Sequence, residues 1–150
     1  TDSLLLERDE LTSGSTWHAA GNVPTFSASW SIMSMQRYSA ALYRTLGEEV
    51  GHPLTYNVTG SLRLAHGPER MAEFARVLGM SRRLGTGMEL LSPEEARARY
   101  PLLETHDLRG ALWDPHDGDI DPAGLTQALA KGARDAGARV LRFCPATGLR

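Results

Sequence analysis

Large apolar side chains recur three, four and seven positions apart in residues 28–50, which is the spacing of one face of an α-helix. This pattern predicts a long helix, and Gly51 and Pro53 are expected to end it. The side chains predicted to face the core are Ile32, Met35, Tyr38, Leu42 and Leu46.

Two shorter helices are predicted by their boundary residues. Residues 68–84 begin with a proline, which suits the first position of a helix, and are followed by Gly85. Ser92 and Glu95 have the spacing of a capping box, in which each side chain binds the backbone of the other residue. They predict a helix that ends before Pro101.

A fourth helix and a returning strand are predicted near the end of the chain. Asp121 is a favourable N-cap and precedes a proline, so the helix should begin there and run to about residue 136. The apolar run 140–143 then predicts a strand that joins a parallel sheet. The helix residues predicted to face inward are Leu125, Leu129 and Ala133.

Continuous and alternating apolar runs predict the remaining strands. Residues 4–6 are three consecutive leucines, as in a strand buried within a parallel sheet. Residues 54–58 and 61–65 predict two strands of one small sheet, with Thr59-Gly60 as the break between them. Residues 109–113 predict another strand. The expected fold class is therefore α/β, or α+β overall.

Composition limits the classes of function. The 150 residues are 41% hydrophobic and 23% charged, which is typical of a globular protein, and the net charge is −2 with both signs interspersed. Neither nucleic acid nor a membrane is therefore an expected partner. The single Cys144 excludes an internal disulfide and a cage of several cysteines around a metal, and fits a reducing compartment.

The acidic segment 114–121 invites a test for calcium binding. Asp117, Asp119 and Asp121 occupy the first three odd positions of an EF-hand loop. However, Pro122 stands where that loop needs glycine, and Ala128 stands where it needs the bidentate glutamate. No metal is therefore expected.

The stretch 11–21 carries the most distinctive chemistry. It packs hydroxyl groups, small residues and glycines around Trp17 and His18, shortly after an apolar run that ends at Glu7. A backbone with such small side chains can approach a phosphate-bearing ligand closely. An acid at the carboxyl end of a parallel strand is where a doubly wound fold contacts a ribose. On the local sequence alone, however, a solvated strand-end charge is the favoured interpretation of Glu7.

Five segments carry a resemblance to a known family. They are Leu-Glu-Arg at 6–8, Gly-Ser-Thr-Trp-His-Ala-Ala-Gly at 14–21, Gly-Ser-Leu-Arg-Leu-Ala at 60–65, Ser-Pro-Glu-Glu-Ala at 92–96 and Asp-Gly-Asp-Ile-Asp-Pro at 117–122. Tyr-Pro-Leu-Leu at 100–103 extends them. With these segments, nearly the whole chain resembles the flavin-dependent dimethylglycine and sarcosine dehydrogenases, which are related to D-amino-acid oxidase.

The resemblance implies a set of FAD contacts. Glu7, followed by Arg8, matches the acid that binds the ribose of the adenosine half. Gly14, Ser15 and Thr16 match the loop that passes the pyrophosphate and ribityl chain.

Three further residues complete the implied site. His18 matches the histidine that is bonded covalently to the flavin in many members, and a neutral imidazole nitrogen is a competent nucleophile for that bond. An ordinary hydrogen-bonded loop histidine is the alternative. Gly21 closes the same motif. Ala146 lies near the position of a valine whose backbone meets the adenine.

The resemblance also implies an architecture. A doubly wound FAD-binding domain would contain residues 1–27 and 120–150, interrupted by a mainly antiparallel substrate domain that takes most of residues 28–119. The first strand and its Gly-x-Gly-x-x-Gly turn, which hold the pyrophosphate on a helix N-terminus, do not occur here. We therefore expect an internal fragment of a longer polypeptide that does not bind FAD tightly alone.

The implied reaction is oxidation of the N-methyl group or neighbouring C–N bond of a small amino acid such as dimethylglycine or sarcosine. Hydride would pass to the flavin, and the iminium would be released as formaldehyde or captured by folate. The expected location is the bacterial cytoplasm or, in a eukaryote, the mitochondrial matrix. No residue is assigned as catalytic base.

Two alternatives stay open at this stage. One keeps the flavin fold but has non-covalent FAD and another secondary amine or a D-amino acid as substrate. The other is a non-catalytic interaction module whose acidic segment 114–121 meets a partner.

Overall fold

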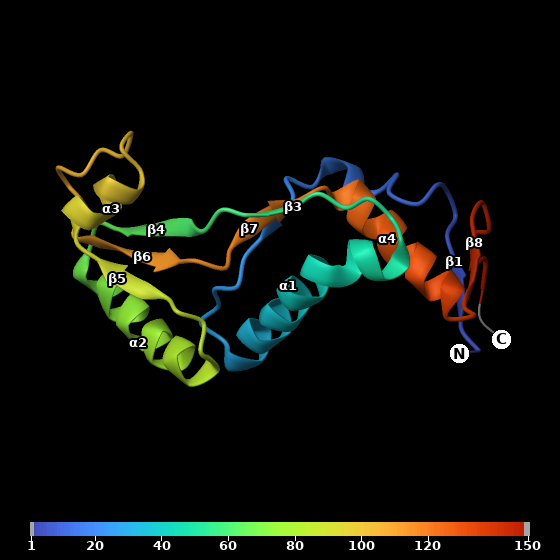
Figure 1. Cartoon of the computed structure of the whole chain (residues 1–150), viewed down its shortest axis with the longest axis horizontal. Helices are drawn as coiled ribbons and strands as arrows, with labels where there is room; N and C mark the ends of the chain where they lie inside the picture. Colours follow the sequence, from blue (N-terminus) through green and yellow to red (C-terminus); the bar gives the residue numbers. More distant parts are fainter. Residues whose placement is uncertain (1, 149–150) are drawn as a thin grey trace. The chain divides into compact units, whose positions relative to one another are not determined.

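The computed structural model describes residues 2–148 and contains mixed helices and strands, as expected (Figure 1). The chain divides into two compact units. Unit 1 comprises the described residues up to Asn22, then Ala41–Asn57, then those from Asp119 onward. Unit 2 comprises Val23–Ala40 and Val58–Gly118. The assignment of FAD-binding and substrate domains to parts of the chain stays a prediction.

Unit 1 is built on a parallel pair of strands from the two ends of the described chain. Strand β1 (Leu4–Leu6) pairs with β8 (Arg139–Leu141) from Leu4 opposite Arg139 to Leu6 opposite Leu141. This confirms the predicted return to a parallel sheet. The expectation that the three leucines are buried is wrong, because each is 43–48% exposed. In residues 2–148, β8 is the only strand that pairs with β1, so the pair lacks the cover that buries a central strand.

Helix α4 (Pro122–Asp135) precedes β8 and begins as predicted. The Asp121 side chain accepts a hydrogen bond from the Ala123 backbone N–H at 3.0 Å, which caps the first turn. The predicted inner face is shifted, because Ala128 is fully buried whereas Leu129 is 42% exposed. A small side chain therefore marks the closest packing of this helix.

Helix α1 (Trp30–Val50) begins in unit 2 and ends in unit 1. The predicted core stripe is wrong in its first half, where Ile32, Met35 and Tyr38 are 46–73% exposed. Met33 and Ala40 are buried there instead, whereas Leu46 is buried in unit 1 as predicted. Because the helix passes from one unit to the other between residues 40 and 41, no single stripe serves both halves.

Unit 2 is organised by an antiparallel sheet in which β6 (Gly110–Asp114) lies between β4 (Ser61–Ala65) and β5 (Glu89–Leu91). Successive β6 residues point to opposite faces. Leu112 belongs to the core cluster beside helix α2 (Pro68–Leu84), and Ala111 to a second cluster beside helix α3 (Pro93–Arg99). The sheet is therefore covered on both faces.

A third sheet contains β2 (Asn22–Val23), β7 (Gly118–Ile120) and β3 (Tyr56–Val58), in the order β2-β7-β3. The sequence predicted β3 and β4 in one small sheet, and this is wrong. The break at Thr59-Gly60 does separate them, but β3 pairs with β7 and β4 pairs with β6. Alternation predicts a strand but does not name its partner, so the pattern could not reveal this.

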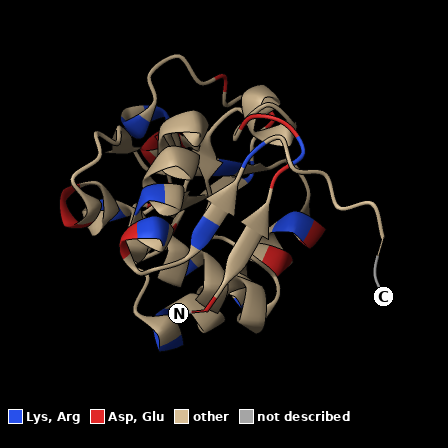
Figure 2. Cartoon of the chain, turned by 90° about the vertical axis from the view of Figure 1, so that its right-hand side faces the viewer, with Lys and Arg blue, Asp and Glu red and all other residues tan. Residues whose placement is uncertain are grey.

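Surface charge is mixed, in keeping with the small net charge. Figure 2 shows Lys and Arg interspersed with Asp and Glu over the side that it presents. Among residues 2–148, no helix combines the length and apolar character needed to cross a bilayer.

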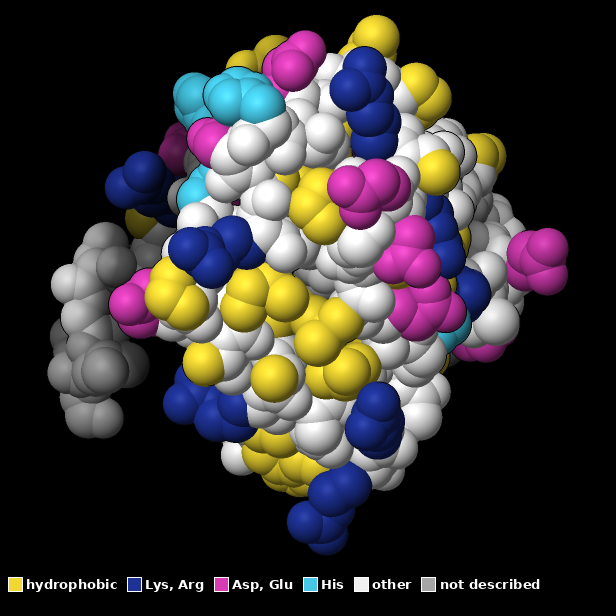
Figure 3. Space-filling model, turned by 90° about the vertical axis from the view of Figure 1, so that its left-hand side faces the viewer, with side chains coloured by type: hydrophobic (Ala, Val, Ile, Leu, Met, Phe, Trp, Pro, Cys, Tyr) yellow, Lys and Arg dark blue, Asp and Glu magenta, His cyan; other side chains and the backbone are white. Residues whose placement is uncertain are grey.

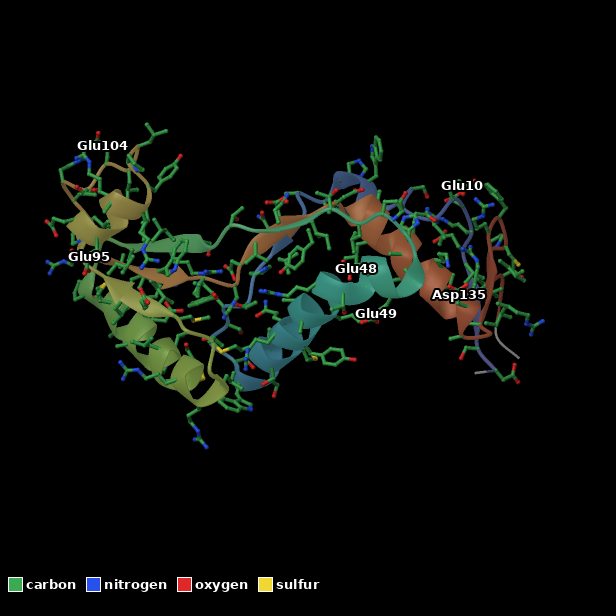
Figure 4. The ribbon with its side chains drawn as sticks, viewed as in Figure 1. Glu10, Glu48, Glu49, Glu95, Glu104 and Asp135 are labelled. Carbon is green, nitrogen blue, oxygen red and sulfur yellow. The ribbon has the colours of Figure 1, made fainter. Side chains whose placement is uncertain are left out.

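The capping box of α3 offers a test of the helix boundaries. The Glu95 backbone N–H donates to the Ser92 hydroxyl at 3.2 Å, and the Ser92 N–H donates to the Glu95 carboxylate at 2.7 Å (Figure 4). Ser92→Ala should lower the free energy of unfolding by about 1 kcal/mol, because one N–H of the first turn loses its acceptor. Denaturant titration measures the change. Ser92→Thr keeps the hydroxyl and is the control; an equal loss in both variants would contradict the assignment.

Candidate functional site

The parallel pair of unit 1 fixes the backbone of Glu7. The Glu7 N–H donates to the Leu141 carbonyl at 2.8 Å, and the Glu7 carbonyl accepts from the Cys144 N–H at 2.8 Å. Glu7 thus lies where both parallel strands end at their carboxyl side. In open α/β sheets this edge is where ligands bind.

The side chains of Glu7 and Arg8 differ in what they offer to a ligand. One Glu7 carboxylate oxygen accepts from the Asp9 N–H at 2.9 Å, and the other can accept from a ligand hydroxyl. Arg8 instead turns toward the Asp9 carboxylate at 3.0 Å, with 78% of its side chain exposed. A pair this exposed contributes little to stability, so Arg8 can change partner at low cost.

The loop that follows exposes small residues. Gly14 is the N-cap of a short 3-10 helix, η1 (Ser15–His18), and no side chain caps its first turn. A side chain added at Gly14 would meet no atom within 4 Å, so the space beside this backbone is open. Gly14, Ser15 and Thr16 therefore leave room for an elongated ligand to lie against the backbone.

His18 ends η1 with its ring exposed. Its Nδ1 lies 3.2 Å from the Gly14 carbonyl oxygen. Because a carbonyl oxygen only accepts, Nδ1 carries the hydrogen in this bond, and the lone pair of the neutral ring is on Nε2. The loop thus holds the ring so that Nε2 is the nucleophilic nitrogen.

Gly21 is explained by packing. Its φ is +81°, and a Cβ at this position would lie 2.3 Å from the Ile120 carbonyl oxygen. The Gly21 carbonyl also accepts from the Ile120 N–H at 2.9 Å. A glycine is therefore required at residue 21 by the neighbouring strand, whether or not a ligand approaches.

Ala146 is exposed and follows the segment that binds the end of β1. The Arg142 guanidinium pairs with the carboxylate of Glu10 at 2.5 Å, and the Cys144 N–H donates to the Glu7 carbonyl. Glu10 is labelled in Figure 4. The structure thus brings segment 142–146 to Glu7. Within residues 2–148, no hydrogen bond joins Glu7 or segment 142–146 to Gly14, Ser15, Thr16 or His18. That these residues form one site stays a prediction.

Sequence reasoning missed a buried polar cluster in unit 2. Asp114 is 0% exposed and Asp117 is 4% exposed, and both lie within hydrogen-bond distance of the Thr25 hydroxyl. Asp117 also accepts from the Thr25 backbone N–H. The signal was present, because Asp114 lies two positions after the core residue Leu112 and so faces the same side of β6. Among the described residues, no group of three or more His, Cys, Asp or Glu could hold a metal ion.

The two carboxyls of this cluster have opposite properties. Burial, together with the charge of Asp117, raises the pKa of Asp114 above its ordinary value. Burial also acts to raise the pKa of Asp117, but hydrogen bonds from Ser61 and Thr25 and the charge of Arg63 outweigh it and hold that pKa below its ordinary value.

A pocket of about 370 Å³ lies in unit 2 beside β4 and β6. Its wall includes Leu62, Leu64, Trp113 and Arg99. Apolar side chains reach the surface at the α2–α3 end of the chain (Figure 3). Arg99 is paired with Glu89 at 2.9 Å and lies 4.8 Å from the centre of the Trp113 ring, so its guanidinium is already engaged. We therefore do not assign it to a substrate carboxylate.

A parallel strand pair with an acid at its carboxyl end, followed by a loop of small residues, is the arrangement of a nucleotide-binding α/β protein. Residues 2–150 match the family model DAO, described as FAD dependent oxidoreductase. The chain belongs to this family of FAD-dependent oxidoreductases, and its fold is that of the family.

Three known proteins illustrate the likeness. Over 149 residues, or 99% of this chain, it is 40% identical to human mitochondrial dimethylglycine dehydrogenase and 38% identical to human mitochondrial sarcosine dehydrogenase. The crystal structure of L-proline dehydrogenase from P. horikoshii covers 98% of the chain with a TM-score of 0.88 and 28% identity. The chain spans 17%, 16% and 39% of these three proteins, respectively.

The packing account of Gly21 makes a testable prediction. Gly21→Ala should destabilise the protein by about 1–3 kcal/mol, because alanine disfavours the positive φ and its methyl group meets the Ile120 carbonyl. Thermal unfolding measures the loss. Gly79→Ala is the matched control, because this helical glycine has open space around it and alanine favours a helix. Gly21→Ala unfolding at the same temperature as Gly79→Ala would refute the account.

Proposed function

We propose that the protein containing this chain is a flavin-dependent oxidoreductase that oxidises the N-methyl or neighbouring C–N bond of a small amino acid, of the dimethylglycine or sarcosine type. The observation that carries the proposal is the family match over residues 2–150, joined to Glu7 at the carboxyl end of β1. The names of the two human relatives supply the substrate class.

The described residues fit one side of an FAD molecule. In the proposal, the free oxygen of Glu7 binds a ribose hydroxyl, with Arg8 beside it, and the backbone at Ala146 meets the adenine. Gly14, Ser15 and Thr16 lie along the pyrophosphate and ribityl chain, where the open space beside Gly14 accommodates them. When bound, the flavin supplies a hydride acceptor.

His18 is proposed as the point of covalent attachment to the flavin ring. The bond from Nδ1 to the Gly14 carbonyl leaves the lone pair on Nε2, which is the atom that would attack. A loop that fixes the ring also reduces the loss of freedom when the bond forms. Within this chain, the role of His18 is to hold the cofactor.

The remaining proposals concern product and location. Oxidation of an N-methyl group gives an iminium, which water would hydrolyse to formaldehyde and the demethylated amine, or whose methylene carbon would pass to folate in the complete protein. The two human relatives are named as mitochondrial, which supports a mitochondrial location if the source is eukaryotic. Within the mitochondrion we propose the matrix, and in a bacterium the cytoplasm.

A second substrate class is favoured by one observation. Proline is a secondary amine, and the structure of an L-proline dehydrogenase superposes on this chain with a TM-score of 0.88. A flavin enzyme with non-covalent FAD that acts on another secondary amine or a D-amino acid is therefore the alternative. The third option, a non-catalytic interaction module, also stays open, because the chain is 34% identical over 139 residues to a mouse protein named as the mitochondrial pyruvate dehydrogenase phosphatase regulatory subunit.

Acid precipitation of the complete protein tests the role of His18. Acid unfolds the protein and releases bound flavin, so only covalently attached flavin stays in the pellet. We expect yellow, fluorescent protein from the wild type and a colourless pellet from His18→Ala, because the variant lacks the nucleophile.

His52→Ala is the control, since this partly buried histidine lies outside the loop and should keep its flavin in the pellet. Flavin that remains attached in His18→Ala would contradict the covalent role. A wild type that binds flavin but releases all of it in acid would favour the non-covalent alternative.

The role of Glu7 is tested by FAD affinity. In the His18→Ala background, where FAD binds reversibly, Glu7→Gln should weaken binding by about tenfold, because a charge-assisted hydrogen bond is replaced by a neutral one. Fluorescence titration of the apoprotein gives the dissociation constant. Glu49→Gln is the control, because Glu49 is an exposed acid of unit 1 that lies on α1, outside the loop. Equal affinities in Glu7→Gln and Glu49→Gln would argue against ribose binding by Glu7.

A further inference from the structure

Two carboxyl groups of unit 2 lie buried and share one hydroxyl group. Asp114 ends β6, Asp117 lies three residues later, and Thr25 follows β2. The Thr25 oxygen is 2.6 Å from Asp114 Oδ2 and 3.2 Å from Asp117 Oδ1. We call Asp114 and Asp117 the carboxyl pair. The positions of the hydrogens on the two carboxyls and on the shared hydroxyl determine which of these contacts are hydrogen bonds.

The contacts of Asp117 require it to be ionised. Its Oδ1 accepts from the Thr25 N–H at 2.6 Å, and its Oδ2 accepts from Arg63 Nη2 at 2.8 Å and from the Ser61 hydroxyl at 2.5 Å. A backbone N–H and a guanidinium only donate, so both oxygens of Asp117 must be acceptors. A proton on either oxygen would compete with these donors.

The contacts of Asp114 accommodate a proton. Its Oδ1 accepts from the His116 backbone N–H at 3.0 Å, whereas Oδ2 faces the Thr25 hydroxyl. Thr25 has a single hydroxyl hydrogen. If that hydrogen points to Asp117, the 2.6 Å contact with Asp114 is a hydrogen bond only when Asp114 carries a proton and donates it to the Thr25 oxygen.

The surrounding charges favour the same distribution. The charge of Asp117 acts on Asp114, and the Arg63 guanidinium contacts Asp117 at 2.8 Å. His116, between the two acids in the sequence, is the other titratable side chain of this segment. Helix α2 packs on the same sheet face, and its Arg70 and Glu73 pair with each other at 2.6 Å. Among the ion pairs of the described residues, Arg63 pairs with Asp117 and none involves Asp114, so a proton on Asp114 removes the second negative charge.

We propose that Asp114 holds a proton at neutral pH and donates it to the Thr25 oxygen, while Thr25 donates its own hydrogen to the Asp117 carboxylate. These two hydrogen bonds attach Thr25 to the sheet of unit 2, and the attachment depends on pH. The proton comes from solvent when the chain folds. Loss of this proton places two carboxylates around one hydroxyl group and weakens the attachment of Thr25 to the sheet.

The two carboxyls impose limits at opposite ends of the pH scale. Because the folded-state pKa of Asp114 is raised, its contribution to stability is present at acidic pH and is lost as the pH rises through that pKa. Because the folded-state pKa of Asp117 is lowered, its contribution is present above its unfolded pKa and is lost as the pH falls. The attachment of Thr25 to the sheet is therefore strongest at pH values between the lowered pKa of Asp117 and the raised pKa of Asp114.

Asn is a close mimic of protonated Asp at residue 114 but not at residue 117. In Asp114→Asn, the amide oxygen can accept from the His116 N–H while the amide nitrogen donates to Thr25. In Asp117→Asn, an NH₂ group must face the Thr25 N–H or the Arg63 guanidinium, which are donors. The same chemical change should thus be tolerated at one position and disruptive at the other.

Hydrogen exchange by mass spectrometry tests this in the complete protein, with peptides that cover residues 23–27 and 110–118. At mildly acidic pH, Asp114→Asn should match the wild type, whereas Asp117→Asn should lose protection. At alkaline pH, the wild type should lose protection relative to Asp114→Asn at the same pH, because only the wild type can ionise there.

Two measurements make the outcome decisive. The infrared band of a protonated carboxylic acid should be present in the wild type at neutral pH and absent in Asp114→Asn. Thr25→Val, which keeps the shape but removes the hydroxyl, should lose protection, whereas Thr25→Ser should keep it. Absence of the acid band, or equal loss of protection in Asp114→Asn and Asp117→Asn, would overturn the proposal.

Discussion

The parallel pairing of β1 with β8 is the constraint on which the candidate site depends. Leu4 lies opposite Arg139, so the first described strand pairs with one that follows after more than a hundred residues. Parallel strands need a crossover connection, and here that connection includes all of unit 2. The pairing fixes the carbonyl and N–H of Glu7 at the carboxyl edge, and it brings the segment ending at Ala146 to the same place.

Local signals were sufficient to predict the helix boundaries. The capping box at Ser92, the N-cap at Asp121 and the left-handed Gly85 are each satisfied by atoms within four residues, so a short window of sequence contains the whole interaction. For the same reason the break at residues 59–60 was predictable. The partners of the strands on either side were not, because pairing is decided by residues far away in the chain.

Burial was predicted less well than secondary structure. Spacing on α1 identified a stripe of large apolar side chains, but Met33 and Ala40 are the residues that pack in unit 2. A helix that crosses between two units has no single inner face. Its apolar residues pack in one unit in the first half of the helix and in the other unit in the second half. The buried Asp114 shows the converse error, since the predicted strand ended at residue 113 and Asp114 was assigned to the acidic segment that follows, whereas it is the last residue of β6.

The residues of the candidate site were identified by their sequence motifs. The structure explains the chemistry of His18 and the need for glycine at residue 21. The Nδ1 bond to Gly14 selects the nitrogen of His18 that is free to react, and no spacing rule contains that choice. Gly21 was grouped with the ligand loop, but its glycine is required by the Ile120 carbonyl. Sequence similarity thus locates a set of residues, whereas contacts separate those that face a ligand from those that shape the loop.

Unit 2 also shows how a fold can bury charge with few cations. Two ionised carboxylates beside one guanidinium would leave a net negative charge out of water, and removing such a charge from water costs several kcal/mol. A proton needs no volume, and Thr25 can pass its effect from Asp114 to Asp117 because a hydroxyl both accepts and donates. In a dense core, a hydroxyl bridge with one proton therefore neutralises the second acid without disturbing the packing.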